Sequence, residues 1–365
     1  MHGRFDLAGF DQFKKRLYEA TGSEPDAALH GHASTLRPSL EEAPHPPHGR
    51  LGWPWTEQSS VFPPNIPDGR FWPRISIITP SYNQGQFIEE TIRSVIFQGY
   101  PNLEYVIIDG GSSDQSVDII RKYEPWITYW VSEKDRGQSH AINKGIARCT
   151  GDVVAWLNSD DVYFPGILKY VAEKYLGTQG DRFWLVAGVE YFDQESGASV
   201  VAFQKEWHSI MDWVVGDAQI HQQGAFWSRA IQDVAGPLQE DFHYGFDKEF
   251  FARLVSLGYR FDCPTDIVAA RYRQHDDCKW KRDLSLFKYD WLRISLMHLP
   301  PGAREYSRIK KELNSGLAYW RIRFSQNAEK SVLARWQDLL AAAQLDASVL
   351  RQRAFWGSVR RLVSP

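Results

Sequence analysis

Four aspartates stand at or just beyond the ends of short apolar runs. They are Asp109, Asp135, Asp160 and Asp161. If these runs form parallel strands, their carboxyl ends meet at one edge of a sheet and the carboxylates share one crevice. Neighbouring carboxylates repel one another unless a cation lies between them, and their oxygens suit Mg²⁺ or Mn²⁺ bound together with substrate phosphates. The pattern indicates a metal-bridged diphosphate site, although any one of these residues could instead close a turn.

The elements that must position these residues alternate between strand and helix. Short β-branched runs bounded by turn residues predict strands, and apolar residues at helical spacing predict helices. The expected strands are 75–79, 103–108, 127–131 and 153–157, and the expected helices are 87–97, 116–123, 139–147 and 168–175. This alternation predicts an α/β fold with a mostly parallel central sheet flanked by helices.

The chain divides into three predicted regions. Residues 1–73 are expected to be a partly irregular N-terminal extension, with a helix over Phe10–Ala20 and a strap over Trp53–Trp72. Residues 74–280 form the main domain, and residues 281–365 a C-terminal helical region. The later expected elements are strands at 183–192, 199–207 and 267–272, and helices at 246–257, 284–299, 304–324 and 331–343.

Composition excludes several classes of protein. The formal net charge of −3 gives no global field for nucleic acid, so no nucleic-acid partner is expected. The three cysteines are far apart and form neither a disulfide framework nor a C-x-x-C pair. No secretory signal and no apolar run of membrane-spanning length is present, which predicts a cytoplasmic protein. The dinucleotide, P-loop, zinc-protease and nucleophile-elbow motifs are also absent.

Four ordered motifs resemble the glycosyltransferases of family 2. They are Ile75–Asn83, Tyr105–Asp114, Asp135–Gly145 and Trp156–Asp161. The resemblance extends from about residue 74 to about residue 275 and says little about the two ends of the chain. It implies an α/β fold of GT-A type, a nucleoside-diphosphate sugar as donor, and inversion at the anomeric carbon.

The same resemblance assigns the donor site. Pro80, Tyr82 and Asp109 would contact the nucleoside, with Asp109 bonded to the base, and Asn83 belongs to this group. Asp135 and Arg136 would line the nucleotide or sugar pocket.

The segment Asn158-Ser159-Asp160 stands where the family has Asp-x-Asp. By the resemblance, Asp160 would hold the metal, and Asp161 would support the metal or the donor sugar. Because Asn158 replaces the first Asp, one sure carboxylate remains for the cation, which predicts a modest metal affinity.

The resemblance also implies residues beyond the donor motifs. Asp247, at the start of an expected helix, would be the general base that accepts the acceptor's proton. Glu249 and Asp241 are its rivals, and an Asp at a helix start is often a cap. His275, after the last expected strand, would reach the metal or the diphosphate.

A closing segment follows from the same comparison. Gln222 and Gln223 would hydrogen-bond sugar hydroxyls, and Trp227 would stack on a sugar ring. Core packing is an equal alternative for Trp227.

The C-terminal segment mixes basic and apolar residues. These are Arg351, Arg353, Arg360 and Arg361 with Phe355, Trp356, Val359 and Leu362. One interpretation is a peripheral contact with the inner face of an anionic membrane. The alternative, a helix docked on its own protein or on a second subunit, is slightly favoured.

Together these features predict an inverting, metal-assisted glycosyltransferase. It would move a sugar from a UDP-sugar by default, with GDP and dTDP open, to a hydroxyl of a glycan or lipid-linked acceptor in bacterial surface polysaccharide synthesis. One alternative is a non-catalytic nucleotide-sugar or glycan-binding module on a degenerate fold, suggested by Asn158. Another is a nucleotidyltransferase, although residues 80–84 lack the cations of its usual loop.

Overall fold

Short β-branched runs between residues 75 and 156 form the strands of a central sheet. The computed structural model describes residues 38–178, 180–207, 211, 220–279, 284–299, 302–324 and 332–363. They belong to two compact units: residues 1–208 with 219–278, and residues 209–218 with 279–365. The helix expected over Phe10–Ala20 lies outside the described residues.

The first unit contains a six-stranded sheet with the order β3-β2-β1-β4-β9-β6. Its strands are β1 (Ile75–Ser81), β2 (Leu103–Asp109), β3 (Tyr129–Ser132), β4 (Val153–Trp156), β6 (Trp184–Val186) and β9 (Ala225–Ser228). The first four strands are mutually parallel, whereas β9 is antiparallel to β4 and β6. The predicted mostly parallel sheet is therefore confirmed.

The register of the parallel strands brings their carboxyl ends to one edge. Ser81 pairs with Asp109, and Asp109 pairs with Ser132. The segment after β4 starts at the same edge, because Leu157 N donates to Ile78 O at 2.9 Å. The carboxyl ends of the parallel strands therefore lie together at one edge of the sheet, as predicted.

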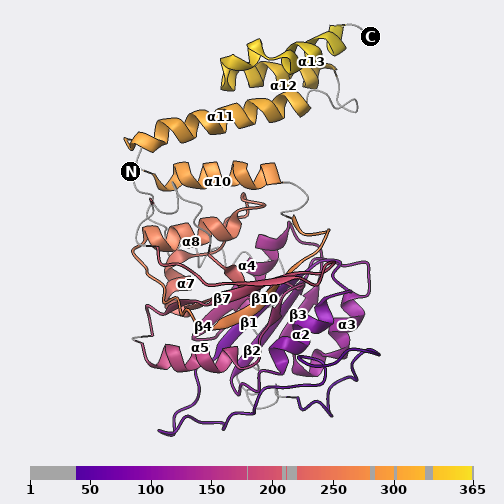
Figure 1. Ribbon diagram of the computed structural model, residues 1–365, viewed down its shortest axis with the longest axis vertical. Helices are drawn as coiled ribbons and strands as arrows, with labels where there is room; N and C mark the ends of the chain where they lie inside the picture. Colours follow the sequence, from indigo (N-terminus) through magenta and orange to yellow (C-terminus); the bar gives the residue numbers. More distant parts are fainter. Residues whose placement is uncertain are drawn as a thin grey trace. The chain divides into compact units, whose positions relative to one another are not determined.

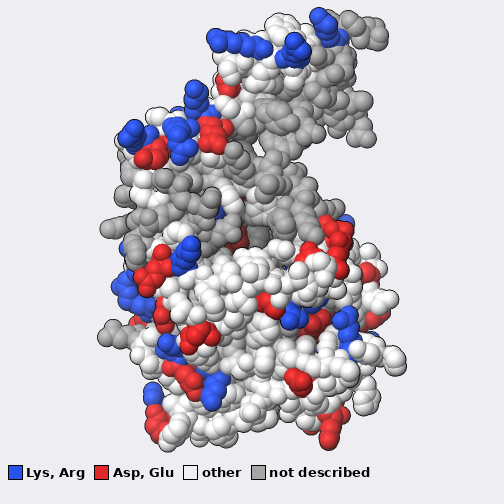
Figure 2. All heavy atoms as spheres, in the orientation of Figure 1, with Lys and Arg blue, Asp and Glu red and all other residues white. Residues whose placement is uncertain are grey.

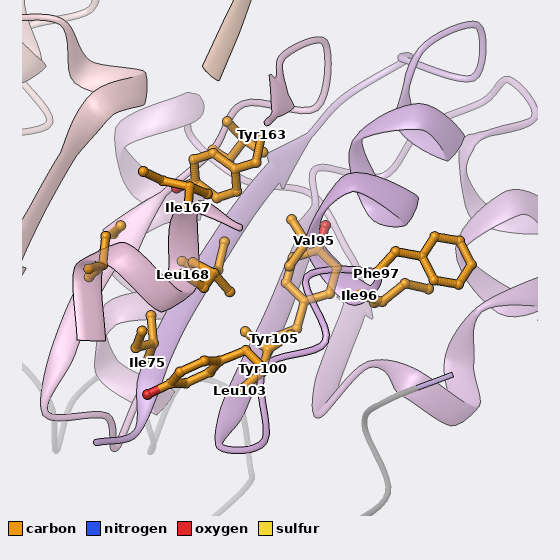
Figure 3. Close-up of a cluster of buried hydrophobic side chains, with 14 of the residues drawn as sticks. Ile75, Val95, Ile96, Phe97, Tyr100, Leu103, Tyr105, Tyr163, Ile167 and Leu168 are labelled. Carbon is orange, nitrogen blue, oxygen red and sulfur yellow. The ribbon is translucent and has the colours of Figure 1, made fainter. Parts of the chain in front are cut away.

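Successive residues of a strand point to opposite sides of the sheet. Different helices therefore pack on the two faces. The helices of this unit are α2 (Ile88–Ile96), α3 (Ser116–Lys122), α4 (Gln138–Arg148), α5 (Ile167–Leu176), α7 (Arg229–Ala235) and α8 (Phe246–Ser256). Ile75 and Tyr105 share one apolar cluster with residues of α2 and α5, including Val95 and Leu168 (Figure 3). Figure 1 shows α2 and α5 on one side of the strands and α4 on the other.

A glycine lets α4 approach the sheet closely. A Cβ atom on Gly145 would lie 2.4 Å from Cγ2 of Ile78. Any larger side chain would push α4 away from β1, and α4 carries the residues that follow the Asp135 loop. Gly145 therefore sets the depth at which this part of the site lies.

A second sheet has the order β5-β10-β7-β8. Its strands are β5 (Val162–Tyr163), β7 (Gly188–Asp193), β8 (Ser199–Ala202) and β10 (Val268–Gln274). β8 pairs with β7 in antiparallel orientation, whereas β10 pairs with β7 in parallel. The single strand expected at 183–192 is divided, since β6 belongs to the first sheet. β10 ends beside the loop of Asp160 and Asp161 and leads directly into His275.

Residues 38–72 lie as an irregular strap on the first unit. Arg93 of α2 is fully buried and donates to the carbonyl oxygens of Pro44, Pro54 and Trp55 at 2.7–3.0 Å. Trp53 Nε1 donates to Tyr163 O at 2.7 Å. These bonds satisfy a buried cation through strap carbonyls, so the strap is part of the core.

The second unit is helical in its described residues. It contains α10 (Leu284–His298), α11 (Arg304–Phe324), α12 (Val332–Leu345), a 3₁₀ turn η4 (Ala347–Arg351) and α13 (Arg353–Val363). Phe355 of α13 is buried with Ala318, Leu339 and Ala342. None of the described helices combines the length and apolar character needed to cross a bilayer.

Figure 2 shows acidic and basic side chains interspersed on the visible face of the first unit.

Candidate active site

Asp109 closes the turn that follows β2. Its buried carboxylate accepts the main-chain N–H groups of Gly111 (3.1 Å) and Ser112 (2.8 Å) and the hydroxyls of Ser112 (2.5 Å) and Ser132 (2.7 Å). A carboxylate offers about four lone-pair positions, so protein donors account for its capacity. Asp109 has the turn-closing role that the sequence left open, and a base could reach it only by displacing one of these donors.

Tyr82, Gly110 and Asp135 come together at the ends of β1 and β2. A Cβ atom on Gly110 would lie 2.7 Å from Oδ2 of Asp135 and 3.3 Å from Cδ2 of Tyr82. The Tyr82 side chain remains 60% exposed. A larger residue at position 110 would collide with Asp135, so glycine allows the Tyr82 ring and the Asp135 carboxylate to lie near each other at the ends of β1 and β2.

Asn83 links the loop after β1 to the loop after β2. Its backbone has a φ of 51°, a left-handed conformation that Asn tolerates better than most residues. Its N–H donates to Ser112 Oγ at 2.7 Å, and its Oδ1 accepts the N–H of Ser113 at 2.8 Å. Asn83 thus holds the loop in place. Pro80 is buried within β1.

Backbone N–H groups of the loop of Asp135, Arg136 and Gly137 donate to side-chain acceptors. Gly137 N donates to Asp135 Oδ1 at 2.8 Å, and Arg136 N donates to His140 Nδ1 at 3.1 Å. Burial lowers the pKa of His140, which favours the neutral ring that this bond requires. The Arg136 guanidinium pairs with Glu240 at 2.8 Å. The loop therefore depends on a neutral histidine and on a carboxylate from a distant segment.

Asn158 is the centre of an amide network. Its Nδ2 donates to Asp161 Oδ2 at 3.1 Å and to Gln222 Oε1 at 3.3 Å. Its Oδ1 accepts Nε2 of Gln138 at 2.8 Å. The network joins the end of β4, the start of α4 and the segment before β9, so Asn158 positions its neighbours.

Asp161 is fully buried behind this network. Burial raises the pKa of its carboxyl well above the ordinary value, and the charge of Asp160 acts in the same direction. Three donors oppose this shift: the Arg273 N–H to Oδ1, and the side-chain amides of Asn158 and Gln223 to Oδ2, each at 3.1 Å. These bonds favour the ionised form, and they make Asp161 a support for the loop of Asp160.

Asp160 meets His275 at the open side of the loop. Asp160 Oδ2 and His275 Nε2 are 3.1 Å apart, and the Asp160 side chain keeps 20% of its surface exposed. The hydrogen bond with Asp160, followed by that with Cys278, raises the pKa of His275 to about 10, although burial opposes the shift. Without a metal, an imidazolium therefore pairs with the carboxylate, and a cation and this proton compete for the same two groups.

Arg273 fixes the backbone on which Asp160 stands. Its Nε donates to Asp160 O at 3.0 Å, and Nη2 pairs with Glu90 of α2 at 2.9 Å. Its Nη1 donates to Gln194 Oε1. One buried guanidinium thus links β10, α2 and the loop of Asp160.

Asp247 is the second residue of α8 and lies in its first turn. It is half-buried, and its Oδ1 accepts the N–H of Lys248 at 2.7 Å. Its rival Glu249 is buried and paired with Arg253 at 2.8 Å, and burial raises the pKa of Glu249. Asp247 is thus the more accessible of the two, whereas Asp241 is exposed.

The segment before α8 is tied to the Asp135 loop. The buried amide of Asn143 donates to Leu238 O at 2.9 Å and accepts the Leu238 N–H at 2.8 Å. A Cβ atom on Gly137 would lie 3.3 Å from Cε1 of His243. Together with the Arg136–Glu240 pair, these contacts place the segment leading to Asp247 beside the predicted donor site.

The expected closing segment is partly wrong. Trp227 is fully buried on β9, where it donates to Gln232 Oε1 at 3.0 Å and packs on Trp156 with ring centroids 5.3 Å apart. It cannot stack on a sugar, because no face of its ring is open. Gln222 is also buried, and its Nε2 donates to Trp156 O at 2.7 Å, which orients the amide network rather than a sugar.

Three residues contribute to the site without having been assigned a role from the sequence. Cys278 lies with Asp160 and His275 in a group whose ligand atoms are all within 4.8 Å of one another. Its signal was the His-x-x-Cys spacing. Asn143 lies in the predicted Asp135–Gly145 motif without an assigned role, and Glu240 gave no local signal, because each acts through a partner about a hundred residues away in sequence.

Comparison with known proteins identifies part of the chain. Residues 76–192 match the model of glycosyl transferase family 2. An uncharacterized glycosyltransferase of Mycobacterium tuberculosis strain H37Rv is 29% identical over 184 residues, which are 50% of this chain and 68% of that protein. The putative teichuronic acid biosynthesis glycosyltransferase TuaG of Bacillus subtilis is 41% identical over 92 residues, which are 24% of this chain and 36% of TuaG. Among solved structures, residues 1–349 of S. aureus TarS are 18% identical at a TM-score of 0.49, covering 80% of this chain and 88% of that one.

The family match spans β1 to β7 and contains the Asp109, Asp135 and Asp160 loops. With the sheet order β3-β2-β1-β4, it confirms the predicted α/β fold of GT-A type. Asp247 and His275 lie beyond the matched residues, so their roles depend on the geometry of the site.

Proposed function

The chain belongs to glycosyl transferase family 2 through residues 76–192 and is a glycosyltransferase. From this premise we propose that it is an inverting, metal-assisted enzyme that uses a nucleoside-diphosphate sugar. The observation that carries the proposal is the Asp160–His275 pair, 3.1 Å apart at the carboxyl edge of the sheet. The family and the glycosyltransferase relatives argue against the non-catalytic alternative, whose main support was Asn158. Asn158 is explained by its bond to Asp161.

The side chains of Asp160 and His275 suit a divalent cation. Two ligand atoms about 3 Å apart fit around one ion with metal–ligand bonds of about 2.1 Å. Asp160 and His275 are the residues that would hold it, as predicted, with Mn²⁺ or Mg²⁺ as the expected ion. When bound, the cation would stabilise charge on the leaving diphosphate.

The nucleoside would lie against Tyr82 and Asp135. Tyr82 is exposed beside the Gly110 position, where its ring can cover one face of a base. Asp109 would act mainly by holding this loop. UDP is the default nucleotide, and Asn83 and Arg136 would shape the pocket through the bonds described above.

Asp247 would accept the proton of the acceptor hydroxyl as that oxygen attacks the anomeric carbon. Its half-buried position at the start of α8 and the Glu240 and His243 contacts of the preceding segment support this role. The step transfers the sugar to the acceptor oxygen and leaves the nucleoside diphosphate on the donor side. Attack opposite to the leaving group inverts the anomeric configuration.

The acceptor would be a hydroxyl of a glycan or of a lipid-linked glycan. The similarity to TuaG, named for teichuronic acid biosynthesis, supports a place in bacterial surface polysaccharide synthesis. A cytoplasmic protein with access to a lipid-linked acceptor fits this role.

The C-terminal segment bears on membrane contact. The apolar face of α13 is covered within its own unit, because Phe355 is buried and Val359 and Leu362 pack against the same cluster. Arg353, Arg360 and Trp356 remain exposed. A peripheral contact would therefore depend on these side chains. Flotation with anionic liposomes should recover the full chain more than a chain ending at Val349, and equal recovery would remove the membrane idea.

Nucleotide binding and transfer can be separated experimentally. Thermal unfolding should be measured with UDP, GDP, CDP and dTDP, each with and without Mn²⁺. A nucleotide at about 100 times its dissociation constant stabilises the fold by about 2.7 kcal/mol. We expect a metal-dependent shift with one nucleotide.

Two variants test the residues. Asp160→Ala should lose the metal-dependent shift and transfer together, whereas Asp247→Asn should keep the shift and lose transfer. Wild-type turnover in both variants would contradict the assignment. The absence of a shift with every nucleotide would contradict the donor site.

A further inference from the structure

Cys278 is held on the same turn as His275. Cys278 N donates to His275 O at 3.1 Å, and His275 N donates to Cys278 Sγ at 3.3 Å. The thiol in turn donates to Arg273 O at 3.4 Å. Both side chains are buried. The turn therefore presents an imidazole and a thiol at a fixed separation.

The third member of the group comes from a distant loop. The ligand atoms of Asp160, His275 and Cys278 all lie within 4.8 Å of one another. In a tetrahedral site with bonds of about 2.1 Å for nitrogen or oxygen and about 2.3 Å for sulfur, two ligand atoms lie about 3.4–3.6 Å apart. Within the 4.8 Å limit, a shift of the thiol by about 1 Å brings all three atoms to the spacing that one tetrahedral cation requires.

The donor types select among cations. A carboxylate alone suits Mg²⁺ or Mn²⁺, whereas imidazole and thiolate suit Zn²⁺ and similar transition metals. Three protein ligands with a remaining open position are also the arrangement of catalytic zinc sites.

We propose that Cys278 is a third protein ligand of the cation at Asp160 and His275, so that the site prefers thiophilic divalent ions such as Zn²⁺ and Co²⁺ to Mg²⁺. The proposal rests on the proposed function for the Asp160–His275 pair. On binding, the thiol loses its proton to solvent and the S–H···O bond to Arg273 is replaced by a sulfur–metal bond. No oxidant or reductant is required.

Cobalt spectroscopy tests the sulfur ligand directly. Co²⁺ is added to the full chain after chelator treatment and dialysis. We expect a thiolate-to-cobalt charge-transfer band in the near ultraviolet with wild type. Cys278→Ser should remove this band while visible d–d absorption from the remaining ligands persists. Its Zn²⁺ affinity should fall at least tenfold with little change for Mg²⁺.

Cys263→Ser is the matched control. Cys263 is half-buried in the same unit and lies outside the ligand group, so this variant should keep the band and the Zn²⁺ affinity. A wild-type cobalt complex without the charge-transfer band, or a band that Cys278→Ser retains, would overturn the proposal.

A second measurement needs no variant. X-ray absorption of the Zn²⁺-loaded wild type should show a sulfur scatterer at about 2.3 Å, and a shell of nitrogen and oxygen alone would overturn the inference. Metal-dependent nucleotide binding with such a shell would leave the proposed function standing. Nucleotide binding without any metal dependence would instead contradict the metal role in the proposed function.

Discussion

The side-chain amide of Asn158 donates a hydrogen bond to the buried carboxylate of Asp161 across 3.1 Å. This bond explains why an amide replaces the first acid of the Asp-x-Asp pattern. A carboxylate at position 158 would face a second carboxylate that is already buried, and like charges in such a site disfavour ionisation. The replacement thus stabilises the support of Asp160.

Asn158→Asp should therefore destabilise the protein without improving metal binding. We expect the free energy of unfolding in a chelator to fall by about 1–3 kcal/mol, because a donor is lost and a buried charge is added. Urea unfolding measures the change. Asn158→Ala, which loses the donor but adds no charge, should lose less. A stable Asn158→Asp variant with higher Mn²⁺ affinity would contradict this interpretation.

Gly110→Ala should weaken nucleotide binding while the fold persists. Its Cβ would lie 2.7 Å from Asp135 Oδ2 and 3.3 Å from Tyr82 Cδ2, so the carboxylate must leave its present position. We expect at least about a tenfold loss in nucleotide affinity, equivalent to about 1.4 kcal/mol, measured by calorimetry. Gly177→Ala is the control, because its Cβ would meet nothing closer than 3.6 Å. Equal affinities in all three proteins would count against the Tyr82–Asp135 pocket.

Arg273→Met should cost stability and metal-dependent binding for separate reasons. Removing the guanidinium leaves Glu90 buried and unpaired, which costs about 3–5 kcal/mol. It also releases the carbonyl of Asp160. In the double variant Arg273→Met/Glu90→Gln, unfolding measurements should show partial recovery of stability, whereas nucleotide binding with Mn²⁺ should stay weak. Recovery of both would show that Arg273 acts only through the fold.

Because of His140, we expect the free energy of unfolding to fall in mild acid. Burial lowers its pKa in the folded state, so the unfolded chain takes up the proton first as the pH falls. The contribution of His140 is therefore complete above its unfolded pKa of about 6.5 and is lost as the pH falls from that value through the lower pKa of the folded state. The charged groups that act on it are Glu240, Arg136, Lys144 and Asp135.

His140→Asn removes the titration but keeps an oxygen that can accept the Arg136 N–H. The stability difference between wild type and this variant should therefore shift in favour of the variant between about pH 7.5 and about pH 5.5. Urea unfolding at both values measures it. A difference that does not change with pH would show that His140 does not control this window.

Trp227→Phe should affect stability and leave donor recognition unchanged. The ring is fully buried and its N–H is bonded to Gln232, so the substitution leaves a cavity and an unpaired amide. We expect a loss of about 2–4 kcal/mol, with an unchanged KM for the sugar nucleotide in steady-state kinetics. A raised KM at wild-type stability would restore the sugar-stacking role.

The sequence by itself determined the α/β core and the edge at which the chemistry lies. Apolar, β-branched runs next to Pro80, Asp109 and Asn158 define strands locally, although β1 continues through Pro80 to Ser81, and parallel pairing follows from the helices between them. The mutual proximity of the strand-end loops needs no further information, because all parallel strands point the same way.

Only the tertiary structure decided which polar groups are partners and which are buried. Asp160 meets His275 across 115 positions of sequence, and Arg136 meets Glu240 across 104. Trp227 has the composition of a sugar-stacking residue, yet β9 places it in the core. A side chain's type is a local property, whereas its partner and its exposure to water depend on segments that the chain brings together only when it folds.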